Sequence, residues 1–285
     1  MTSFTIADSD LAGVKDKVVI ITASSGIGLE TLNLLLQHDA KVFAGDLNPL
    51  PYPQADTVPF KQVNVTSWTD QLELFKAAYA KYSRIDHVFA NAGVNPTTYL
   101  LEDDVDEKGD LLPPNLRTID INLTGVIYTV KLGIHYLKKN AEGGSIVMTA
   151  SASSFSRFPV PDYTASKHGV LGVLRALSAL LPEHDLPIRI NAISPSWTAT
   201  AIIPEAFAKA LEGVNSIQTP DVAARSAVVC MADAKRNGEC VYSEMGKFFE
   251  LENGVVGMHA RIAEMVNLES VLSVGLKAAA GAPRE

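Results

Sequence analysis

The sequence predicts a doubly wound α/β fold in which one parallel β-sheet is covered by helices on both faces. Short apolar runs rich in β-branched residues alternate with longer segments of helical periodicity along most of the chain. The apolar runs are nearly continuous, which is typical of strands that are buried on both faces. The first feature indicates strand–helix–strand units, and the second indicates a sheet between two helical layers.

Six strands and five helices are expected in alternation. The apolar runs place strands at 17–22, 41–46, 57–63, 86–90, 145–150 and 188–193. Helical patterns lie at 27–38, 68–82, 116–139, 163–181 and 220–234, and a final strand near 248–251 is expected to close the sheet. Thr66 or Ser67 can cap the second helix, while Thr219, Pro220 and Asp221 supply a cap, a first-turn proline and an acidic residue for the last one.

The 285 residues are expected to form one domain. Hydrophobic residues make up 47% and charged residues 20% of the chain, as in globular proteins with a substantial core. The sequence has no internal repeat and no linker long enough to separate two domains. We expect a core from about 17 to 251 with loosely ordered ends, including the Ala- and Gly-rich tail at 277–285.

The charge balance and the apolar stretches exclude several classes of partner. The chain has 24 basic and 32 acidic side chains, a net charge of -8 and no basic run, which argues against a nucleic-acid partner. Lys131, Lys138 or Arg175 interrupts each apolar stretch before it reaches the roughly 18 residues of a membrane span. The first ten residues lack the pattern of a secretory signal, so we expect a cytoplasmic location without a membrane partner.

Cys230 and Cys240 lie in the last predicted helix and the strand after it, without a cluster of metal ligands nearby. We expect buried thiols, and a redox pair is the alternative, which a reducing compartment disfavours. The histidines do not cluster either, so no metal site is expected.

Residues 96–114 differ in composition from the rest of the chain, with six carboxylates and only one lysine. This segment has two interpretations. It is a solvated surface loop, or it is a functional rim over an active site, since loops of this length often act as lids.

A glycine-containing turn links the first predicted strand to the first helix. In Ser24-Ser25-Gly26-Ile27-Gly28 the glycines allow the backbone to approach a pyrophosphate, and the helix start supplies free amides and a positive dipole. Asp46 ends the second strand, where a carboxylate can accept hydrogen bonds from both ribose hydroxyls and repel a 2′-phosphate. These features predict NAD rather than NADP. The alternative for Asp46 is that it only starts a turn with Leu47-Asn48-Pro49.

Tyr163 and Lys167 are four residues apart in a helical pattern and therefore lie on one helix face. A nearby cation stabilises a phenolate and lowers the pKa of the phenol, which makes proton transfer feasible near neutral pH.

These features together resemble the classical short-chain dehydrogenase/reductase family over about 17–251. Asn91-Ala92-Gly93 is similar to the family's turn beside the cofactor. Asn122 matches its helix asparagine, which holds a water that links the lysine to solvent. In the segment 195–200, similar to the family's Pro-Gly-x-x-x-Thr, Thr198 and Thr200 would contact the nicotinamide amide and a nearby phosphate. The cofactor-binding residues that the resemblance implies are Ser25, Gly26, Ile27, Gly28, Asp46, Asn64, Val65, Asn91, Ala92, Gly93, Tyr163, Lys167, Pro195, Thr198 and Thr200.

The active-site serine of the family usually stands thirteen residues before the tyrosine, where this chain has Ala150. A one-residue deletion in the following loop assigns the role to Ser151, and Ser153 is the alternative. Each serine could instead be a loop hydroxyl that bonds to nearby backbone.

Four further positions depart from the family pattern. Thr22 stands at the first glycine and Ile21 at the preceding threonine, so the Thr22 side chain is expected to project into the diphosphate turn. Asn64 replaces the aspartate that bonds adenine, and its amide can still accept and donate hydrogen bonds. Ser196 replaces the glycine of the Pro-Gly pair.

The resemblance implies hydride transfer between NAD and a secondary alcohol or ketone. Tyr163 would transfer the proton, Ser151 would bond the substrate oxygen, and Lys167 would bind the nicotinamide ribose and lower the pKa of the tyrosine. Two alternatives remain. The same site could catalyse imine reduction or an isomerisation, or the chain could be a non-catalytic nucleotide-binding protein.

A small-molecule substrate is expected against residues near the nicotinamide segment. Trp197, Ile202, Ile203 and Phe207 are apolar and indicate a hydrophobic ring or chain, with Ser153 as a further contact. The alternative is a helix that packs on its own core side, since apolar pockets and cores share composition. The resemblance also implies a homodimer or homotetramer, because the helices at 116–139 and 163–181 usually pair across a two-fold axis.

Overall fold

The computed structural model describes residues 3–22, 24–98, 100–203, 209 and 217–253. Its centre is a nine-stranded sheet in the order β1-β9-β8-β7-β6-β5-β2-β3-β4. All strand pairs from β4 to β8 in that order are parallel, whereas β9 pairs antiparallel with β8 and β1. The strands are β1 (Ser3–Phe4), β2 (Val18–Thr22), β3 (Lys41–Asp46), β4 (Phe60–Gln62), β5 (His87–Ala90), β6 (Gly144–Thr149), β7 (Ile188–Pro195), β8 (Cys240–Glu244) and β9 (Lys247–Glu250).

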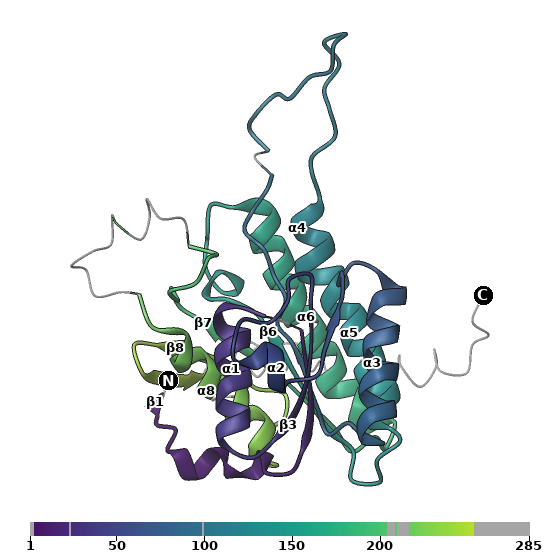
Figure 1. Cartoon of the computed structure of the whole chain (residues 1–285). Coiled ribbons are helices and arrows are strands. Elements are labelled where there is room, and N and C mark those ends of the chain that lie inside the picture. Colours follow the sequence, from purple (N-terminus) through teal and green to yellow (C-terminus); the bar gives the residue numbers. More distant parts are fainter. Residues whose placement is uncertain (1–2, 23, 99, 204–208, 210–216, 254–285) are drawn as a thin grey trace.

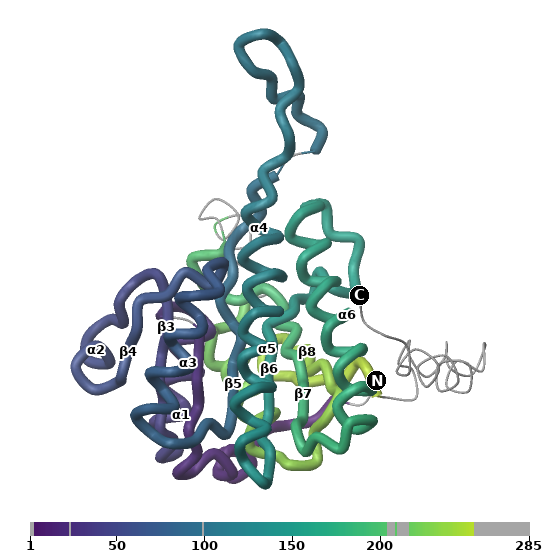
Figure 2. The backbone as a smooth tube through the Cα atoms, turned by 90° about the vertical axis from the view of Figure 1, so that its right-hand side faces the viewer, coloured from purple at the N-terminus to yellow at the C-terminus, as the bar shows by residue number. Residues whose placement is uncertain are grey.

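Helices cover both faces of this sheet, which confirms the predicted fold class (Figures 1 and 2). Apolar side chains of α1 and α8 pack on one face, and those of α3, α5 and α6 pack on the other. The helices are η1 (Asp8–Val14), α1 (Gly26–Gln37), α2 (Gln54–Thr57), α3 (Trp68–Tyr82), α4 (Arg117–Ile119), η2 (Asp120–Thr124), α5 (Gly125–Leu137), η3 (Ala152–Ser154), α6 (Pro161–Glu183) and α8 (Pro220–Ala232).

The sheet reverses its strand order between β2 and β5. From β2 the chain builds β3 and β4 toward one edge, and from β5 it builds β6 and β7 toward the other. The loops after β2 and β5 therefore diverge at the carboxyl ends of adjacent strands, which is where open α/β sheets bind their ligands.

The strand that the sequence predicts at 57–63 is shorter in the structure. The helix α2 ends at Thr57, and β4 contains only Phe60–Gln62. Pro59 lies between them and has no N–H to donate to a strand ladder, which explains why pairing begins one residue later.

The helix predicted at 116–139 is divided. A short α-helical turn, α4, leads into the five-residue π-helix η2, and α5 follows. A π-helical turn widens the backbone spiral, frequently at functional sites. The predicted asparagine, Asn122, lies in the middle of this turn and is fully buried.

The last strand lies within one residue of its predicted place, and β9 forms a hairpin with β8. Met245 and Gly246 connect the two strands, and both have positive φ, at 48° and 79°. Two positive φ values match the tight turn that joins antiparallel strands. Beyond β9 the sheet gains β1, a two-residue strand that the sequence pattern did not predict.

Residues 100–116, which we call the arm, project away from the body at the end of the sheet that bears the loops after β5 (Figures 1 and 2). Val105 and Leu111 form an antiparallel bridge, and Asp104 accepts a backbone hydrogen bond from Leu112 at 2.8 Å. The side chain of Leu101 is 99% exposed. The acidic segment is thus an ordered but solvent-exposed ribbon that does not fold back over the sheet.

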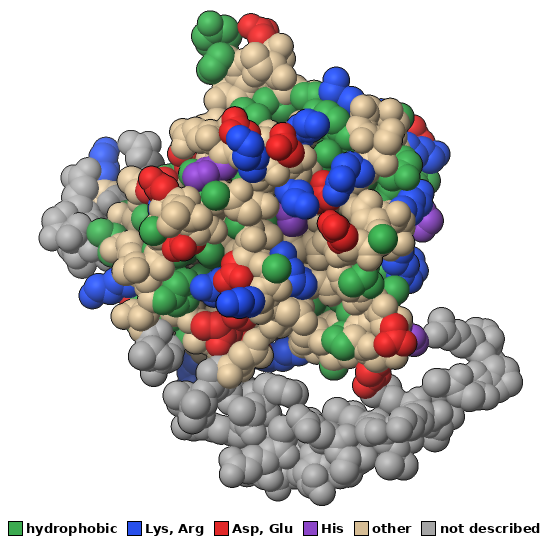
Figure 3. Space-filling model, turned by 90° about the horizontal axis from the view of Figure 1, so that it is seen from below, with side chains coloured by type: hydrophobic (Ala, Val, Ile, Leu, Met, Phe, Trp, Pro, Cys, Tyr) green, Lys and Arg blue, Asp and Glu red, His purple; other side chains and the backbone are tan. Residues whose placement is uncertain are grey.

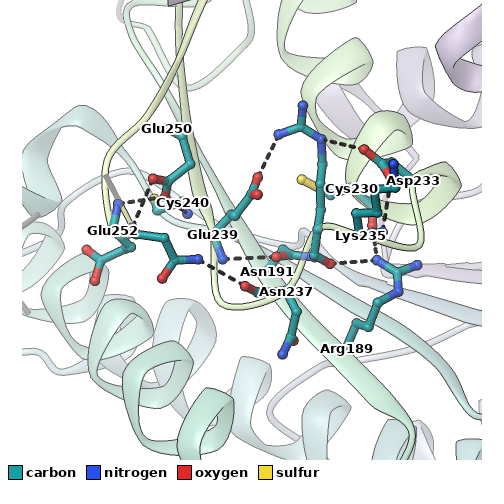
Figure 4. Close-up of polar contacts among 12 residues, drawn as sticks. Arg189, Asn191, Cys230, Asp233, Lys235, Asn237, Glu239, Cys240, Glu250 and Glu252 are labelled. Atoms are coloured by element: carbon teal, nitrogen blue, oxygen red, sulfur yellow. Dashed lines mark hydrogen bonds and ion pairs between the residues drawn. The ribbon is translucent and has the colours of Figure 1, made fainter. Parts of the chain in front are cut away.

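The opposite end of the molecule presents acidic and basic side chains interspersed with one another (Figure 3). Inside it lies the side chain of Arg189, near Cys230 and Asp233 (Figure 4). Arg189 donates hydrogen bonds to the backbone carbonyls of Cys230 and Met231 at the end of α8, and to the carbonyl of Arg236 beyond it. Cys230 and Cys240 are buried free thiols, as expected. Burial raises the pKa of Cys230 to about 12, which keeps that thiol protonated.

Candidate active site

The start of α1, at the turn after β2, has no side-chain cap. Ser25 caps α1 in an extended conformation without a side-chain hydrogen bond, and the first turn of the helix contains no acidic residue. Gly26 has a φ of +52°, and a Cβ there would lie 2.9 Å from Cγ2 of Thr200. The predicted residues Gly26 and Thr200 therefore lie against each other. Gly28 is buried, and Ile27 packs on the core beneath the turn.

The expectation that Thr22 projects into this turn is wrong. Its side chain is buried at the end of β2, where the hydroxyl accepts hydrogen bonds from the backbone N–H groups of Asn91 and Ala92 at 3.1 and 3.2 Å. It therefore ties the loop after β2 to the loop after β5.

Asp46 lies where the sequence predicts, at the end of β3 beside the glycine turn. Its Oδ2 accepts a hydrogen bond from the backbone N–H of Ser24 at 2.8 Å, and its Oδ1 accepts one from Asn48 at 2.9 Å. The second bond is the turn interaction of the alternative interpretation. A carboxylate oxygen has more than one lone pair, so these two bonds leave Asp46 able to accept further hydrogen bonds.

A cavity of about 300 Å³ opens next to the carboxyl ends of β3 and β4. The residues that line it are Leu47, Asn64, Thr66, Asn115, Leu116, Arg117, Asp120 and Ile121. Asn64 uses its side-chain oxygen to hold its own turn, accepting from the backbone N–H of Thr66 at 3.1 Å. Val65 is buried, and its side chain packs where Gly125 lacks one.

The loop after β5 meets the catalytic candidates directly. A Cβ on Gly93 would lie 3.3 Å from Oδ1 of Asn122, a tight contact, and 3.7 Å from Nζ of Lys167, so Gly93 lies directly against both groups. Asn91 accepts a hydrogen bond from the hydroxyl of Thr149 at 2.9 Å. Three motifs that are far apart in the sequence therefore converge on one point.

Asn122 fastens the π-helical turn to this loop. Its Oδ1 accepts a hydrogen bond from the backbone N–H of Val94 at 2.8 Å, and its Nδ2 donates one to the Val94 carbonyl at 3.1 Å. The side chain thus pairs with the backbone as a neighbouring strand would, and it fixes the π-helix against the β5 loop.

Tyr163 and Lys167 share one face of α6, as predicted. The Lys167 Nζ lies 5.6 Å from the centroid of the Tyr163 ring and donates a hydrogen bond to the Thr149 carbonyl at 2.8 Å. Lys167 is only 3% exposed, and burial lowers the pKa of its ammonium group to about 8. The Tyr163 hydroxyl is hydrogen-bonded to Ser151.

The predicted lowering of the Tyr163 pKa is wrong for this structure. Burial raises the pKa of the phenol above its ordinary value, and the Ser151 hydrogen bond offsets only part of that rise. The physical reason is desolvation, which disfavours the phenolate.

The structure distinguishes the two candidate serines. Ser151 bonds to Tyr163 and accepts a hydrogen bond from the backbone N–H of Ser153 at 3.2 Å. The Ser153 hydroxyl is buried and has no hydrogen-bond partner among the described residues. Ser151 therefore faces the tyrosine, whereas the Ser153 hydroxyl is enclosed by protein.

The segment after β7 places an aromatic side chain near the site. Trp197 packs on Phe158 with ring centroids 5.4 Å apart, which joins this segment to the loop before Tyr163. Ile202 is partly exposed and Ile203 is half-buried, whereas Phe207 lies outside the described residues. Phe158 is not among the residues predicted for the site, although an aromatic residue in the loop that leads to Tyr163 is a usable signal.

Pro195 ends β7, and Thr198 is held inside the protein. The Thr198 hydroxyl donates to the Ser196 carbonyl at 2.9 Å and accepts from Nε2 of Gln218 at 3.1 Å. These bonds fix the backbone that leads to Thr200.

No helix in the described part of the chain is long and apolar enough to cross a membrane. The same residues contain no group of three or more His, Cys, Asp or Glu side chains that could hold a metal ion.

Comparisons with known proteins agree with this arrangement. A family model described as short chain dehydrogenase matches residues 16–210. Short-chain dehydrogenase/reductase ascJ of Acremonium egyptiacum is 44% identical over 262 residues, which are 90% of this chain and 88% of that protein. Short-chain dehydrogenase/reductase prx4 of Penicillium rubens is 38% identical over 207 residues, 72% of this chain and 61% of that protein.

Solved structures share the fold at lower sequence identity. A levodione reductase superposes with a TM-score of 0.69 at 22% identity, covering 81% of this chain and 97% of that one. The protein gox2181 gives a TM-score of 0.68 at 21% identity, with 83% and 97% covered. On the family model, the relatives and the fold together, the chain belongs to the short-chain dehydrogenase/reductase family.

Proposed function

We propose that this member of the family is an NAD-dependent oxidoreductase that interconverts a secondary alcohol and a ketone on a hydrophobic ring or chain. The observation that supports this most directly is the cluster of Tyr163, Ser151 and Lys167 at the carboxyl ends of the strands. The cluster lies beside the loop that Thr22 ties to the glycine turn.

The nucleotide would lie along the loops at the switch point of the sheet. The amides of Ser25–Gly28 at the start of α1 would bind the diphosphate, since they are uncapped by any side chain. Asp46 would accept hydrogen bonds from the adenosine ribose, and Asn64 and Val65 would flank the adenine next to the 300 Å³ cavity. Asn91–Gly93, Pro195, Thr198 and Thr200 would border the nicotinamide half. Bound there, the nicotinamide supplies or accepts the hydride.

The protein's own groups would handle the proton. Tyr163 would donate a proton to the substrate oxygen in reduction and remove it in oxidation, while Ser151 would hydrogen-bond that oxygen. Lys167 would bind the nicotinamide ribose, and its ammonium group, 5.6 Å from the centroid of the Tyr163 ring, would stabilise the charge that develops on the phenol as it gives up its proton. Asn122 would hold the water through which Lys167 exchanges protons with solvent.

The preference for NAD rests on charge. A 2′-phosphate next to Asp46 would bring two anions together, and the amide of Ser24 already donates to that carboxylate. The preference for an apolar substrate rests on the Phe158–Trp197 pair and on the partly exposed Ile202.

The test is turnover measured by the absorbance of NADH with a panel of apolar cyclic and chain ketones, and of sugars as a control. We expect reduction of apolar ketones with NADH preferred over NADPH. The variant Tyr163→Phe is expected to lose about 100-fold or more in kcat and to bind NADH as tightly as the wild type. Substrate conversion without a net change in NADH would favour an isomerisation, and NADH binding without any conversion would favour a nucleotide-binding role.

We also propose a cytoplasmic homodimer or homotetramer that pairs through α5 and α6. Ile127 on α5 is 44% exposed, and Leu180 on α6 is similarly uncovered, which leaves apolar surface on both helices. Light scattering at defined protein concentration checks the assembly, and a monomer at micromolar concentration would contradict it.

A further inference from the structure

Asp162, the residue directly before Tyr163, is buried although it is charged. It occupies the second position of α6 and is only 5% exposed. Its Oδ2 accepts hydrogen bonds from the backbone N–H groups of Thr97 at 2.8 Å and Thr98 at 3.1 Å. Its Oδ1 accepts one from the N–H of Tyr163 at 2.7 Å.

These bonds connect α6 to the base of the arm. The hydroxyls of Thr97 and Thr118 are 2.9 Å apart, and the Thr118 hydroxyl donates to the Asn95 carbonyl at 3.0 Å. The Thr98 hydroxyl donates to the carbonyl of Asn115 on the returning strand of the arm. The two chain segments at the base of the arm, Thr97–Thr98 and Asn115, are therefore joined to each other and to α4. Asp162 joins them to the first turn of α6.

Asp162 is an ionised acceptor in this network. Burial acts to raise its pKa, but hydrogen bonds from Thr97, Thr118, Tyr163 and Thr98 outweigh burial, and the net pKa lies below the ordinary value. Hydrogen bonds to a charged carboxylate are stronger than those between neutral groups. The Asp162 side chain therefore contributes much of the stabilisation of Thr97 and Thr98 against α6.

The start of α6 has no side-chain cap, and the loop before it is held to the first turn by the Thr164 hydroxyl, which donates to the Phe158 carbonyl at 3.0 Å. Its capping residue, Val160, has no side-chain oxygen, and the preceding loop contains exposed residues such as Phe155 and Arg157. The first residue, Pro161, has no N–H. Asp162 therefore supplies from inside the helix the acceptor that a Ser, Thr or Asp cap usually provides.

We propose that Asp162 is a positioning residue for the reaction: it fixes the first turn of α6 against Thr97 and Thr98, and thereby sets the place of the Tyr163 hydroxyl. The inference rests on the proposed proton transfer by Tyr163. Displacement of a catalytic group by about 1 Å can reduce a rate by about 100-fold. Because Asp162 is the residue next to Tyr163, loss of its hydrogen bonds is expected to lower kcat.

Two substitutions at Asp162 and one matched control test the proposal. Asp162→Ala removes every acceptor. Asp162→Asn keeps one oxygen that can accept from Thr97 and Thr98. Asp221→Ala is the control, because Asp221 also follows a proline at the start of a helix, α8, but is exposed and far from the arm in sequence.

We expect Asp162→Ala to lower kcat by about 10- to 100-fold with an unchanged dissociation constant for NADH. Asp162→Asn is expected to recover most of kcat, and Asp221→Ala to keep all of it. Hydrogen exchange provides a readout that does not depend on activity. The amides of Thr97, Thr98 and Tyr163 should exchange faster in Asp162→Ala and near the wild-type rate in Asp162→Asn.

Three results would overturn the proposal. One is wild-type kcat in Asp162→Ala. Another is a loss of kcat in both Asp162 variants that follows the loss of thermal stability, which indicates a structural role only. The third is unchanged exchange at Thr97 and Thr98 in Asp162→Ala. If the wild type turns over no substrate, the proposed function fails. Hydrogen exchange at Thr97, Thr98 and Tyr163 still shows whether Asp162 fixes this segment to α6.

Discussion

The hydroxyl of Ser151 accepts a hydrogen bond from the backbone N–H of Ser153 at 3.2 Å. This bond orients the Ser151 side chain, because an N–H donor occupies one of its two lone pairs. The Ser151 proton and remaining lone pair are then available to Tyr163 and to a substrate oxygen.

Ser151→Ala is therefore expected to lower kcat by about 100-fold, the usual loss when one donor to a reacting oxygen is removed. Ser153→Ala should leave kcat nearly unchanged and maintain or raise thermal stability, since it removes a buried hydroxyl without a partner among the described residues. Steady-state kinetics and thermal unfolding check both variants. A greater loss of kcat in Ser153→Ala than in Ser151→Ala would reverse the assignment.

Asp46→Ser is expected to shift cofactor preference toward NADP. The substitution removes the charge that repels a 2′-phosphate, and the ratio of kcat/KM for NADP to that for NAD should rise by about tenfold or more, equivalent to about 1.4 kcal/mol. Asp46→Asn is the matched control, because it removes the charge but keeps an oxygen that can accept from Ser24. An unchanged ratio in both variants would show that Asp46 only supports the turn.

Reductive turnover should fall as the pH rises through about 8. Burial lowers the pKa of Lys167 to about 8, so its ammonium group is charged below that pH and neutral above it. A neutral lysine no longer stabilises the charge that develops on Tyr163 as it gives up its proton. The pH profile of kcat/KM reports groups of the free enzyme and checks this expectation.

Lys167→Arg gives the comparison for that profile, since an arginine stays charged throughout the accessible range. If the variant is active, its profile should be flat where the wild type falls. A wild-type profile without a fall near pH 8 would exclude Lys167 as the titrating group.

His87 should make the protein sensitive to acid. Its side chain is buried at the start of β5, with Nδ1 2.8 Å from the Ser145 hydroxyl. Burial, reinforced by the nearby charge of Arg189 and partly opposed by Asp86, lowers its pKa from 6.5 to about 3.

The sign of the effect on the free energy of unfolding follows from the protonation of His87 in the folded and unfolded chains. Above pH 6.5 the imidazole is neutral in both states, and it contributes no pH dependence. Between pH 6.5 and about 3 the unfolded chain binds a proton that the folded chain does not, so the free energy of unfolding decreases as the pH falls. The contribution approaches about 1.4 kcal/mol per pH unit. Denaturant unfolding of the wild type and of His87→Gln across this range checks it, and equal slopes in the two proteins would contradict it.

Removal of the tip of the arm should leave catalysis intact. Asp104 and Leu112 are hydrogen-bonded partners, so residues 105–111 can be replaced by an Asn-Gly turn without moving the base of the arm. We expect wild-type kcat and KM, because the tip stands away from the body (Figure 2). A large increase in the KM of the substrate would support the alternative in which the arm forms a rim over an active site.

The sequence by itself determined the fold class, most element positions and the identity of the motifs. Continuous apolar strands and periodic helices are local patterns, and Tyr163 and Lys167 share a face because a helix brings residues four apart together. The strand β3 and the helix α3 have the predicted bounds. The sequence could also mark Asn122 and Gly93 as candidates by their order along the chain.

Only the tertiary structure decided which way the side chains point. The Thr22 hydroxyl turns toward Asn91 because the loops after β2 and β5 are neighbours in space, which no local pattern contains. The π-helical turn at Asn122, the inward hydroxyl of Ser153 and the contact of Asp162 with Thr97 likewise depend on partners distant in sequence. Burial, which raises the pKa of Tyr163 and lowers that of Lys167, is also a property of the packed molecule, because it depends on how much water the other elements exclude.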